Sequence, residues 1–333
     1  MIEYAIHEVP SLVGSLQSPI ETRDPVVRYL CALFAELAYY YVPQWEIDNQ
    51  KRAKLIPCDA YQTILSRGRP TDRTSFLQQL DSPFAFAVAD RGVVAVGLVI
   101  NKILLIGFRG TQFLFDWKVN VRSKLAPVTY RFGRSDYFSL VSGRLHSGFA
   151  EESVRISLRI LDAMRDLDIG EIEYVFITGH SLGGAVAAIA EGYLRRLFSP
   201  IYVSVCVFGA PKYADLSAYM SLPKAPPIQV RRPGDIVPTV PPRAFGYVDN
   251  PYEFATDGSQ YFDPAPYSSS LGGIIRWARF LSGRFAPHKM ETYRSEVGIA
   301  AGVQGAKLPL ASVDKLILAN IGASSNVQPQ VGI

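Results

Sequence analysis

The chain has 333 residues, of which 48% are hydrophobic and 19% are charged, and its formal net charge is +4. This composition is typical of a folded protein with a large core and excludes an intrinsically disordered chain. The small net charge, without a run of Lys and Arg, excludes the strongly basic surface with which many proteins bind nucleic acids.

Few features of the sequence indicate export or insertion into a membrane. Three cysteines are too few for a disulfide framework. The N-terminal residues lack the basic start and the apolar core of a signal peptide. The most apolar run, residues 93–108, is too short to span a bilayer and is interrupted by Asn101-Lys102. We therefore expect a cytoplasmic protein, with secretion by a non-standard route left open.

The first half of the chain predicts a helix followed by strands. Residues 24–41 predict a helix, because Asp24 and Pro25 are typical of a helix N-cap and first turn. Three apolar runs between residues 84 and 108 predict strands joined by tight turns, one of them at Asn101-Lys102.

A long polar connection is expected after these strands, and a helix then follows at residues 151–167. Its apolar residues recur at helical spacing. The face expected to be buried consists of Val154, Leu158, Leu161 and Met164.

Strands and helices alternate in the second half of the chain. The expected strands are residues 173–178, 201–208 and 228–232, and the expected helix is 185–197. Almost continuous apolar runs are typical of parallel strands covered on both faces. We therefore predict an α/β fold with a mostly parallel central sheet and helices on both of its faces.

The stretch "ITGHSLGGAVAA" at residues 177–188 places a serine between two glycines, and between a predicted strand and a predicted helix. The pattern Gly179-x-Ser181-x-Gly183 predicts a nucleophile elbow, in which glycines permit a strained turn that exposes the serine. The backbone N–H of Leu182 would then lie at a helix N-terminus and favour a developing oxyanion. The alternative is a tight glycine turn with an incidental serine.

A nucleophilic serine needs a base, which follows it along the chain in this type of fold. Of the four histidines, only His288 follows Ser181. The alternative interpretation of His288 is a helix cap or a surface residue.

The acid that orients the base is expected between Ser181 and His288. Asp235 lies in "VRRPGDIVPTVPP", where a predicted strand ends in a sharp turn, and ligands gather at that edge of such sheets. Spacing alone leaves four other candidates: Asp215, Asp249, Asp257 and Asp263.

Taken together, these stretches resemble the class 3 lipase family, a fungal-type triacylglycerol lipase group within the α/β-hydrolase superfamily. The resemblance covers about residues 85–295 and rests on six segments in the expected order. They are "LLIGFRGT" with "DW" after it, "LHSGF", "ITGHSLGGAVA", "VFGAPKYAD", "RRPGDIVPTVPP" and "HKMETY".

The resemblance implies a role for each of these residues. It implies an α/β-hydrolase fold with Ser181 as nucleophile, Asp235 as acid and His288 as base. It also implies that Thr111 is the second oxyanion donor beside Leu182.

The family places a mobile lid directly after this oxyanion loop. The matching segment is rich in large apolar side chains, which are costly to expose to water. It consists of Gln112, Phe113, Leu114, Phe115, Asp116 and Trp117. The alternative is a fixed helix that packs in the core.

The resemblance thus predicts a single domain over residues 1–333. Its lipase-like core would span about residues 85–295, with an N-terminal helical segment at about 20–83 and a C-terminal extension at about 300–333. The expected activity is hydrolysis of acylglycerols through an acyl-enzyme. Phospholipase A1, a soluble-ester or feruloyl-type esterase, and a non-catalytic interaction module are the alternatives.

The expected partners follow from this activity. They are a lipid or other ester substrate and a transient lipid–water interface. No nucleic acid, nucleotide, metal or other cofactor is expected, because the chain has no Gly-x-Gly-x-x-Gly and no clustered Cys and His.

Overall fold

The structure is a computed structural model that describes residues 9–40, 85–90, 92–110, 124–132, 136–164, 169–198, 201–221, 227–261 and 286–307. Several predictions fall outside the described residues: Thr111, the lid segment at 112–117, and most of the N-terminal segment and of the C-terminal extension.

A central sheet has the strand order β1-β2-β3-β6-β7-β8-β9 in the described part of the chain. The antiparallel neighbours are β1 (Ala85–Asp90), β2 (Val93–Ile100) and β3 (Ile103–Arg109). From β3 onward the neighbours are parallel, and they are β6 (Tyr174–His180), β7 (Tyr202–Phe208), β8 (Ile228–Val230) and β9 (Glu253–Phe254). The sheet is therefore mostly parallel, as predicted.

The turn between β2 and β3 is the one predicted at Asn101-Lys102. Both residues have positive φ angles, 46° and 67°. Two consecutive residues in this region form the type of turn whose twist matches that of the flanking strands. The apolar run at residues 93–108 is thus a hairpin within the sheet.

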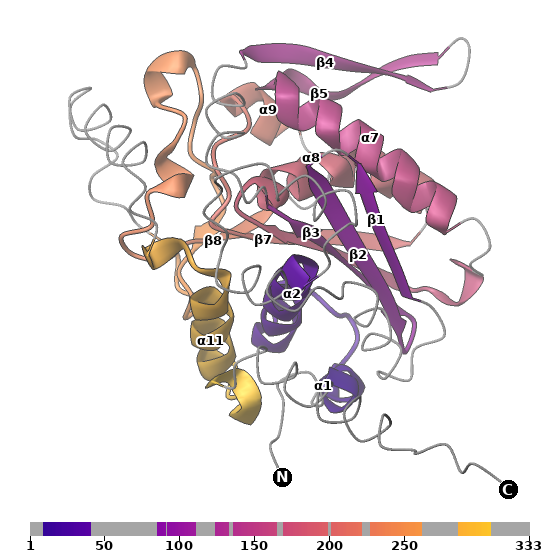
Figure 1. Ribbon diagram of the computed structural model, residues 1–333, viewed down its shortest axis with the longest axis vertical. Coiled ribbons are helices and arrows are strands. Elements are labelled where there is room, and N and C mark those ends of the chain that lie inside the picture. Colours follow the sequence, from indigo (N-terminus) through magenta and orange to yellow (C-terminus); the bar gives the residue numbers. More distant parts are fainter. Residues whose placement is uncertain are drawn as a thin grey trace, which may run out of the picture.

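Alternating side chains divide the core into two layers, one on each face of the sheet. Along β3, Leu104 and Ile106 pack in one layer, whereas Ile103 and Leu105 pack in the other. Figure 1 shows helices covering both faces. The first face carries α7 (Ser147–Ala163) and α8 (Leu182–Leu197), and the second carries α1 (Val9–Ser15), α2 (Pro25–Leu37) and α11 (Met290–Ala300).

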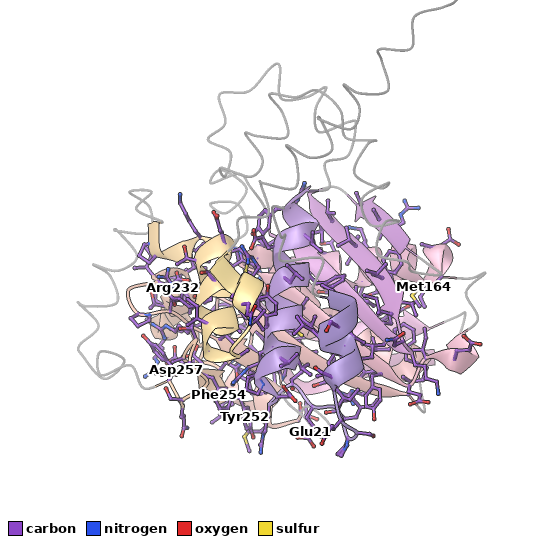
Figure 2. All side chains as sticks on the ribbon, turned by 90° about the horizontal axis from the view of Figure 1, so that it is seen from below. Glu21, Met164, Arg232, Tyr252, Phe254 and Asp257 are labelled. Carbon is purple, nitrogen blue, oxygen red and sulfur yellow. The ribbon has the colours of Figure 1, made fainter. Side chains whose placement is uncertain are left out.

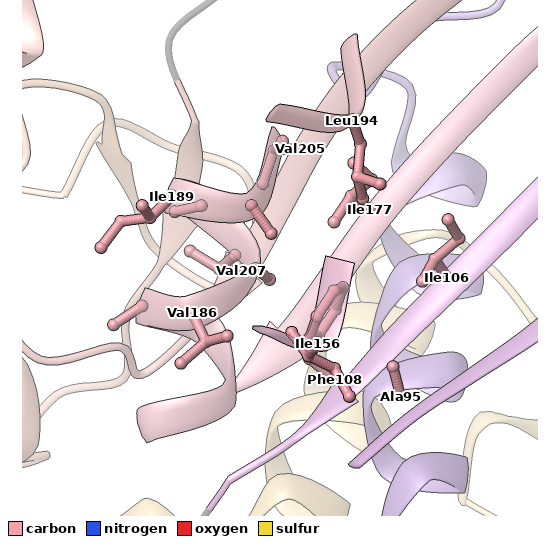
Figure 3. Close-up of a cluster of buried hydrophobic side chains, with 14 of the residues drawn as sticks. Ala95, Ile106, Phe108, Ile156, Ile177, Val186, Ile189, Leu194, Val205 and Val207 are labelled. Carbon is pink, nitrogen blue, oxygen red and sulfur yellow. The ribbon is translucent and has the colours of Figure 1, made fainter. Parts of the chain in front are cut away.

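The first layer is drawn in Figure 3. It contains Val186 and Ile189 of α8, Val205 and Val207 of β7, and Ile156 of α7, all within one buried cluster. Burying a side chain of this size stabilises the fold by about 1.5–3 kcal/mol. Together with the mostly parallel sheet, this packing confirms the α/β fold with helices on both faces that the sequence predicts.

The N-terminal helix forms as its sequence predicts but ends earlier. Asp24 is the N-cap of α2 and accepts a hydrogen bond of 2.7 Å from the backbone N–H of Val26. The helix ends at Leu37 and continues as a short 3₁₀ turn, η2 (Ala38–Tyr40). This turn brings Tyr39 to the edge of the sheet where β6 ends.

The helix expected at residues 151–167 begins earlier and buries a different face. It starts at Ser147 because His146 is its N-cap and accepts a hydrogen bond from the backbone N–H of Phe149. The buried face is Phe149, Ala150, Ser153, Ile156, Ser157 and Ile160. Of the residues predicted to be buried, Met164 lies in the core and Val154 packs against it, whereas Leu158 is 50% exposed. Small serines let α7 approach α8, and Ser153 donates to the Val186 carbonyl, so apolar spacing identified the buried face only in part.

Several elements were not predicted, among them α1 and β9. The expected polar connection contains an antiparallel pair, β4 (Leu125–Phe132) and β5 (Asp136–His146). A short helix, α9 (Leu216–Met220), follows β7. The remaining short turns are η4 (Ile169–Glu171), η5 (Val237–Thr239), η6 (Arg243–Phe245), η7 (Ala286–His288) and η8 (Gln304–Lys307). Among the helices within the described ranges, none is long and apolar enough to cross a bilayer.

Candidate active site

Ser181 lies between β6 and α8 with a strained backbone. Its φ and ψ angles are 59° and −133°, a region that residues with a side chain rarely occupy. Such strain costs about 1–3 kcal/mol and persists where the surrounding structure holds it. Here the Ser181 N–H donates to the Phe208 carbonyl at 3.0 Å, and the Ser181 carbonyl accepts from Gly184 N–H at 2.9 Å.

The glycines around Ser181 are required by close backbone contacts. A Cβ on Gly179 would lie 2.5 Å from the Gly183 carbonyl oxygen. A Cβ on Gly183 would lie 2.6 Å from the Phe108 carbonyl oxygen. Side chains at either position would therefore push α8 away from the strands. The glycine spacing in the sequence reflects this contact between helix and sheet.

The end of β3 lies directly against this turn. A Cβ on Gly110 would meet Ser181 Cβ at 3.1 Å and the His180 carbonyl oxygen at 2.8 Å. Leu182 is the first residue of α8, where backbone N–H groups and the helix dipole favour negative charge. Thr111 comes directly after Gly110 in the chain but lies outside the described residues.

Asp235 and His288 form a hydrogen-bonded pair. His288 Nδ1 lies 2.8 Å from Asp235 Oδ2, and the Asp235 side chain is completely buried. Burial by itself would raise the pKa of Asp235. The positive charge that His288 can carry and several hydrogen bonds outweigh it and lower this pKa. A carboxylate in this position orients the imidazole and stabilises its protonated form.

Tyr293 is a partner of Asp235 that sequence reasoning missed. Its hydroxyl donates to Asp235 Oδ2 at 2.6 Å, and the Val237 N–H donates to Oδ1 at 2.9 Å. Tyr293 lies on α11, five residues after His288 in the segment "HKMETY". The segment is part of the resemblance, but nothing in its spacing predicts that Tyr293 contacts Asp235.

Arg232 ties the acid loop to the segment that carries His288. Its guanidinium forms two hydrogen bonds with Glu296, of 3.0 and 2.7 Å, and donates to the Pro287 carbonyl at 2.6 Å. Planar, two-point contacts of this kind hold a fixed geometry. Arg232 therefore holds the residue before His288 in place.

His180 connects the serine turn to the Asp–His pair. Its ring lies 4.4 Å from the ring of His288, measured between centroids, and its Nδ1 lies 2.7 Å from the Tyr39 hydroxyl. Burial, followed by the charge of His288, lowers the pKa of His180 well below its ordinary value, so the ring is neutral. His180 is 4% exposed and lies buried beside the serine turn.

The other candidate acids are engaged elsewhere. Asp215 caps α9 and pairs with Arg144, and Asp249 pairs with Lys212. Asp257 bonds to its neighbour Ser259. Asp263 lies outside the described residues. Within the described ranges, no group of three or more His, Cys, Asp and Glu is arranged to hold a metal ion.

Comparison with known families gives one match in the middle of the chain. Residues 105–245 match the family model described as lipase (class 3). The segment includes the serine turn and the loop of Asp235, whereas His288 and α2 lie beyond it.

Several characterised proteins are similar to this chain. The secreted mono- and diacylglycerol lipase 1 of Fusarium solani is 27% identical over 161 residues, which are 47% of this chain and 45% of the relative. Phospholipase A1-II 1 of Oryza sativa subsp. indica is 27% identical over 242 residues, 67% of this chain and 55% of the relative. The chain thus spans about half the length of these relatives.

Solved structures of fungal lipases are also similar. The mono- and diacylglycerol lipase of Aspergillus oryzae has 18% identity and a TM-score of 0.46, over 71% of this chain and 80% of that one. The lipase of Rhizopus microsporus var. chinensis has 20% identity and a TM-score of 0.42, over 69% of this chain and 72% of that one.

The expectation of a cytoplasmic location is wrong by this comparison. The Fusarium relative is named as a secreted lipase, which points outside the cell rather than to the cytoplasm. Cysteine usage was a weak indicator. Cys31 and Cys206 are free and buried, and buried thiols act as small hydrophobic residues in any compartment.

Proposed function

We propose that this chain, whose residues 105–245 match the lipase (class 3) family model, is a member of that family and hydrolyses carboxylic esters of lipids with Ser181 as its nucleophile. One observation carries this proposal. The 2.8 Å contact between Asp235 and His288 lies beside a strained serine turn, and these three groups are the parts that acyl transfer requires.

The proposed reaction has two steps. Ser181 Oγ attacks the ester carbonyl while His288 Nε2 takes the serine proton, because Nδ1–H is held by Asp235. The backbone N–H of Leu182, with Thr111 as the second donor, stabilises the oxyanion. His288 then protonates the leaving alcohol, and water repeats the sequence to release the acid.

Acylglycerols are the proposed substrate class. Support comes from the names of the relatives, which include a mono- and diacylglycerol lipase and a phospholipase A1. Phospholipase A1 activity is therefore the second candidate. The segment 112–117 remains our proposal for a lid that opens at a lipid surface.

A Ser181→Ala variant tests the reaction. We expect turnover of a short-chain p-nitrophenyl ester to fall by roughly four orders of magnitude or more, because the acyl-enzyme can no longer form. Circular dichroism and the urea unfolding midpoint should show a folded protein. A fluorophosphonate probe should label the wild type at Ser181 and leave the variant unlabelled.

Two aspartate variants provide the matched comparison. Asp235→Asn should lower turnover by roughly 10⁴-fold, because the amide favours the wrong tautomer of the base. Asp257→Asn, at an exposed turn, should leave turnover unchanged. Equal activity of the wild type and Ser181→Ala would instead support the non-catalytic interaction module.

A panel of esters then separates the substrate classes. Diacylglycerol, triacylglycerol, phosphatidylcholine and feruloyl esters would be compared under identical conditions. Preference for the first two supports the acylglycerol proposal, whereas preference for phosphatidylcholine assigns the chain to the phospholipase A1 class.

A further inference from the structure

We propose that Tyr39 is a positioning residue of this active site, whose hydroxyl holds His180 as a neutral ring against the base His288. The inference rests on the proposed function and extends it to η2, the 3₁₀ turn that follows α2 and lies outside the segment that matches the lipase family.

Tyr39 reaches the serine turn from a distant part of the chain. Its side chain is 8% exposed, and its hydroxyl lies 2.7 Å from His180 Nδ1, across 141 positions of sequence. The same hydroxyl lies 2.8 Å from the point where a Cβ of Gly110 would be, and Ser181 Cβ lies 3.1 Å from that point. The Tyr39 hydroxyl therefore shares the small space between the end of β3 and the nucleophile.

His180 must stay uncharged while the reaction proceeds. Its ring and that of His288 are 4.4 Å apart at an interplanar angle of 33°. His288 becomes positively charged when it takes the serine proton. A second positive charge on His180, in a buried site where screening is weak, would oppose that step.

The Tyr39 hydroxyl occupies the nitrogen at which His180 would gain this charge. Neutral imidazole has one N–H and one nitrogen with a free lone pair, and protonation occurs at the lone pair. The proposal places the proton of neutral His180 on Nε2, so that the Tyr39 hydroxyl donates to Nδ1 and uses that lone pair. Protonation at Nδ1 would break this donated hydrogen bond, and the hydroxyl would have to turn and accept instead.

The other groups near His180 act in both directions. A hydrogen bond with the backbone of His288 raises the pKa of His180, but burial and the charge of His288 outweigh it. Tyr293 of α11 lies 5.8 Å away between ring centroids, and its hydroxyl is committed to Asp235. Asp235 lies behind His288 and is paired with it. Arg109 ends β3, the strand beside β6, and its side chain is buried.

The position of Tyr39 depends on contacts between helices. Figure 2 shows α2 beside α11. Glu36 of α2 and Arg294 of α11 form a buried ion pair at 2.6 Å, three positions before Tyr39 and one after Tyr293. The contact between the two helices thus positions two tyrosines. Tyr39, in the turn after α2, contacts His180, and Tyr293, on α11, contacts Asp235.

The test compares the pH dependence of wild type and Tyr39→Phe on a soluble short-chain ester below its solubility limit. We expect the acid limb of kcat/KM to move to higher pH by about one unit, because His180 can then take up a proton that blocks the reaction. At pH values well below the limb, this corresponds to a loss of about tenfold in kcat/KM. The phenylalanine keeps the ring and its packing, so a loss of folding is not expected.

The same Tyr39→Phe change made in a His180→Gln variant shows whether Tyr39 acts through His180. Glutamine cannot titrate, so in His180→Gln the added Tyr39→Phe change should leave the acid limb where it was. If the shift persists in His180→Gln, or is absent in Tyr39→Phe alone, the proposal is wrong.

A spectroscopic measurement separates this proposal from the activity itself. In protein with ¹⁵N-labelled histidine that also carries Ser181→Ala, the ring signals of His180 should stay neutral to acid pH. With Tyr39→Phe added they should titrate at higher pH. Identical titrations would overturn the proposal. Absence of ester hydrolysis in the wild type would instead overturn the proposed function while this measurement still stands.

Discussion

The turn around Ser181 requires glycine at positions where a Cβ atom would collide with neighbouring backbone. Gly183 lies so close to β3 that a Cβ would be 2.5 Å from the Arg109 carbonyl carbon and 2.6 Å from the Phe108 carbonyl oxygen. Both contacts are with backbone, which cannot rotate aside as a side chain can. By contrast, a Cβ on Gly14 near the end of α1 would have nothing within 4 Å.

Two glycine-to-alanine variants test this difference. Gly183→Ala should lower the free energy of unfolding by about 1–3 kcal/mol, because α8 must move off the sheet. Its ester hydrolysis should fall further, since the turn carries Ser181. Gly14→Ala should be neutral or stabilise by up to about 1 kcal/mol, because alanine favours a helix. Urea unfolding gives both values, and equal stabilities of the two variants would contradict the close contact.

The contact between α2 and α11 centres on a buried charge pair. Glu36 is 4% exposed and Arg294 is fully buried. Arg294 also donates to the Ala306 carbonyl at 3.0 Å. Burial raises the pKa of Glu36 to about 7, although Arg294 opposes this shift. The pair thus links two helices and makes their contact dependent on pH.

A Glu36→Gln variant should remove part of the pH dependence of stability. The pKa of Glu36 is higher in the folded chain than the unfolded value of about 4.3. Its contribution to stability is therefore complete below about pH 4.3 and is lost as the pH rises through 7. Between pH 5 and 8 the wild type should lose stability relative to Glu36→Gln, by about 1–3 kcal/mol. Urea unfolding at several pH values measures this.

The other titratable groups, which the wild type and Glu36→Gln share, serve as the internal control for the comparison of their stabilities. Burial also raises the pKa of Glu253 to about 7, so both proteins should retain a common pH slope. Only the difference between them belongs to Glu36. A constant difference across this pH range would contradict the assignment.

At the scale of the whole molecule, the two layers of the core have different roles: both stabilise the fold, but one of them also positions residues of the site. The layer with α7 and α8 packs against the face from which the serine turn rises. The layer with α2 and α11 carries Tyr39, Tyr293 and, just before α11, His288. A loss of packing in the second layer therefore displaces groups of the site as well as weakening the fold.

Two matched core variants test whether the layers differ in their effect on activity. Leu30→Ala on α2 and Ile160→Ala on α7 remove buried side chains of equal size, which are 2% and 0% exposed. Each should lower the free energy of unfolding by about 2–5 kcal/mol. At 15 °C, with both proteins folded, Leu30→Ala should also lower kcat, whereas Ile160→Ala should leave it near the wild-type value. Equal kcat values would contradict the division.

How well the sequence predicts a feature depends on how far apart along the chain the interacting residues lie. The strands β1 to β3 and the serine turn were predictable, because side-chain alternation and glycine sterics act within a few residues. The buried face of α7 was predictable only in part, since the small Ser153 and Ser157 pack inward and Leu158 does not. The choice of Asp235 among five carboxylates came from the resemblance, and the pairing with His288 needed coordinates.

By itself, then, the sequence determined a mostly parallel α/β sheet, a strained serine turn and the residue types that the proposed ester hydrolysis requires. Only the tertiary structure decided which side chains meet there: Tyr293 with Asp235 across 58 positions, and Tyr39 with His180 across 141. The physical reason is that local backbone sterics are encoded in neighbouring residues, whereas hydrogen bonds between distant side chains exist only once helices have packed on the sheet.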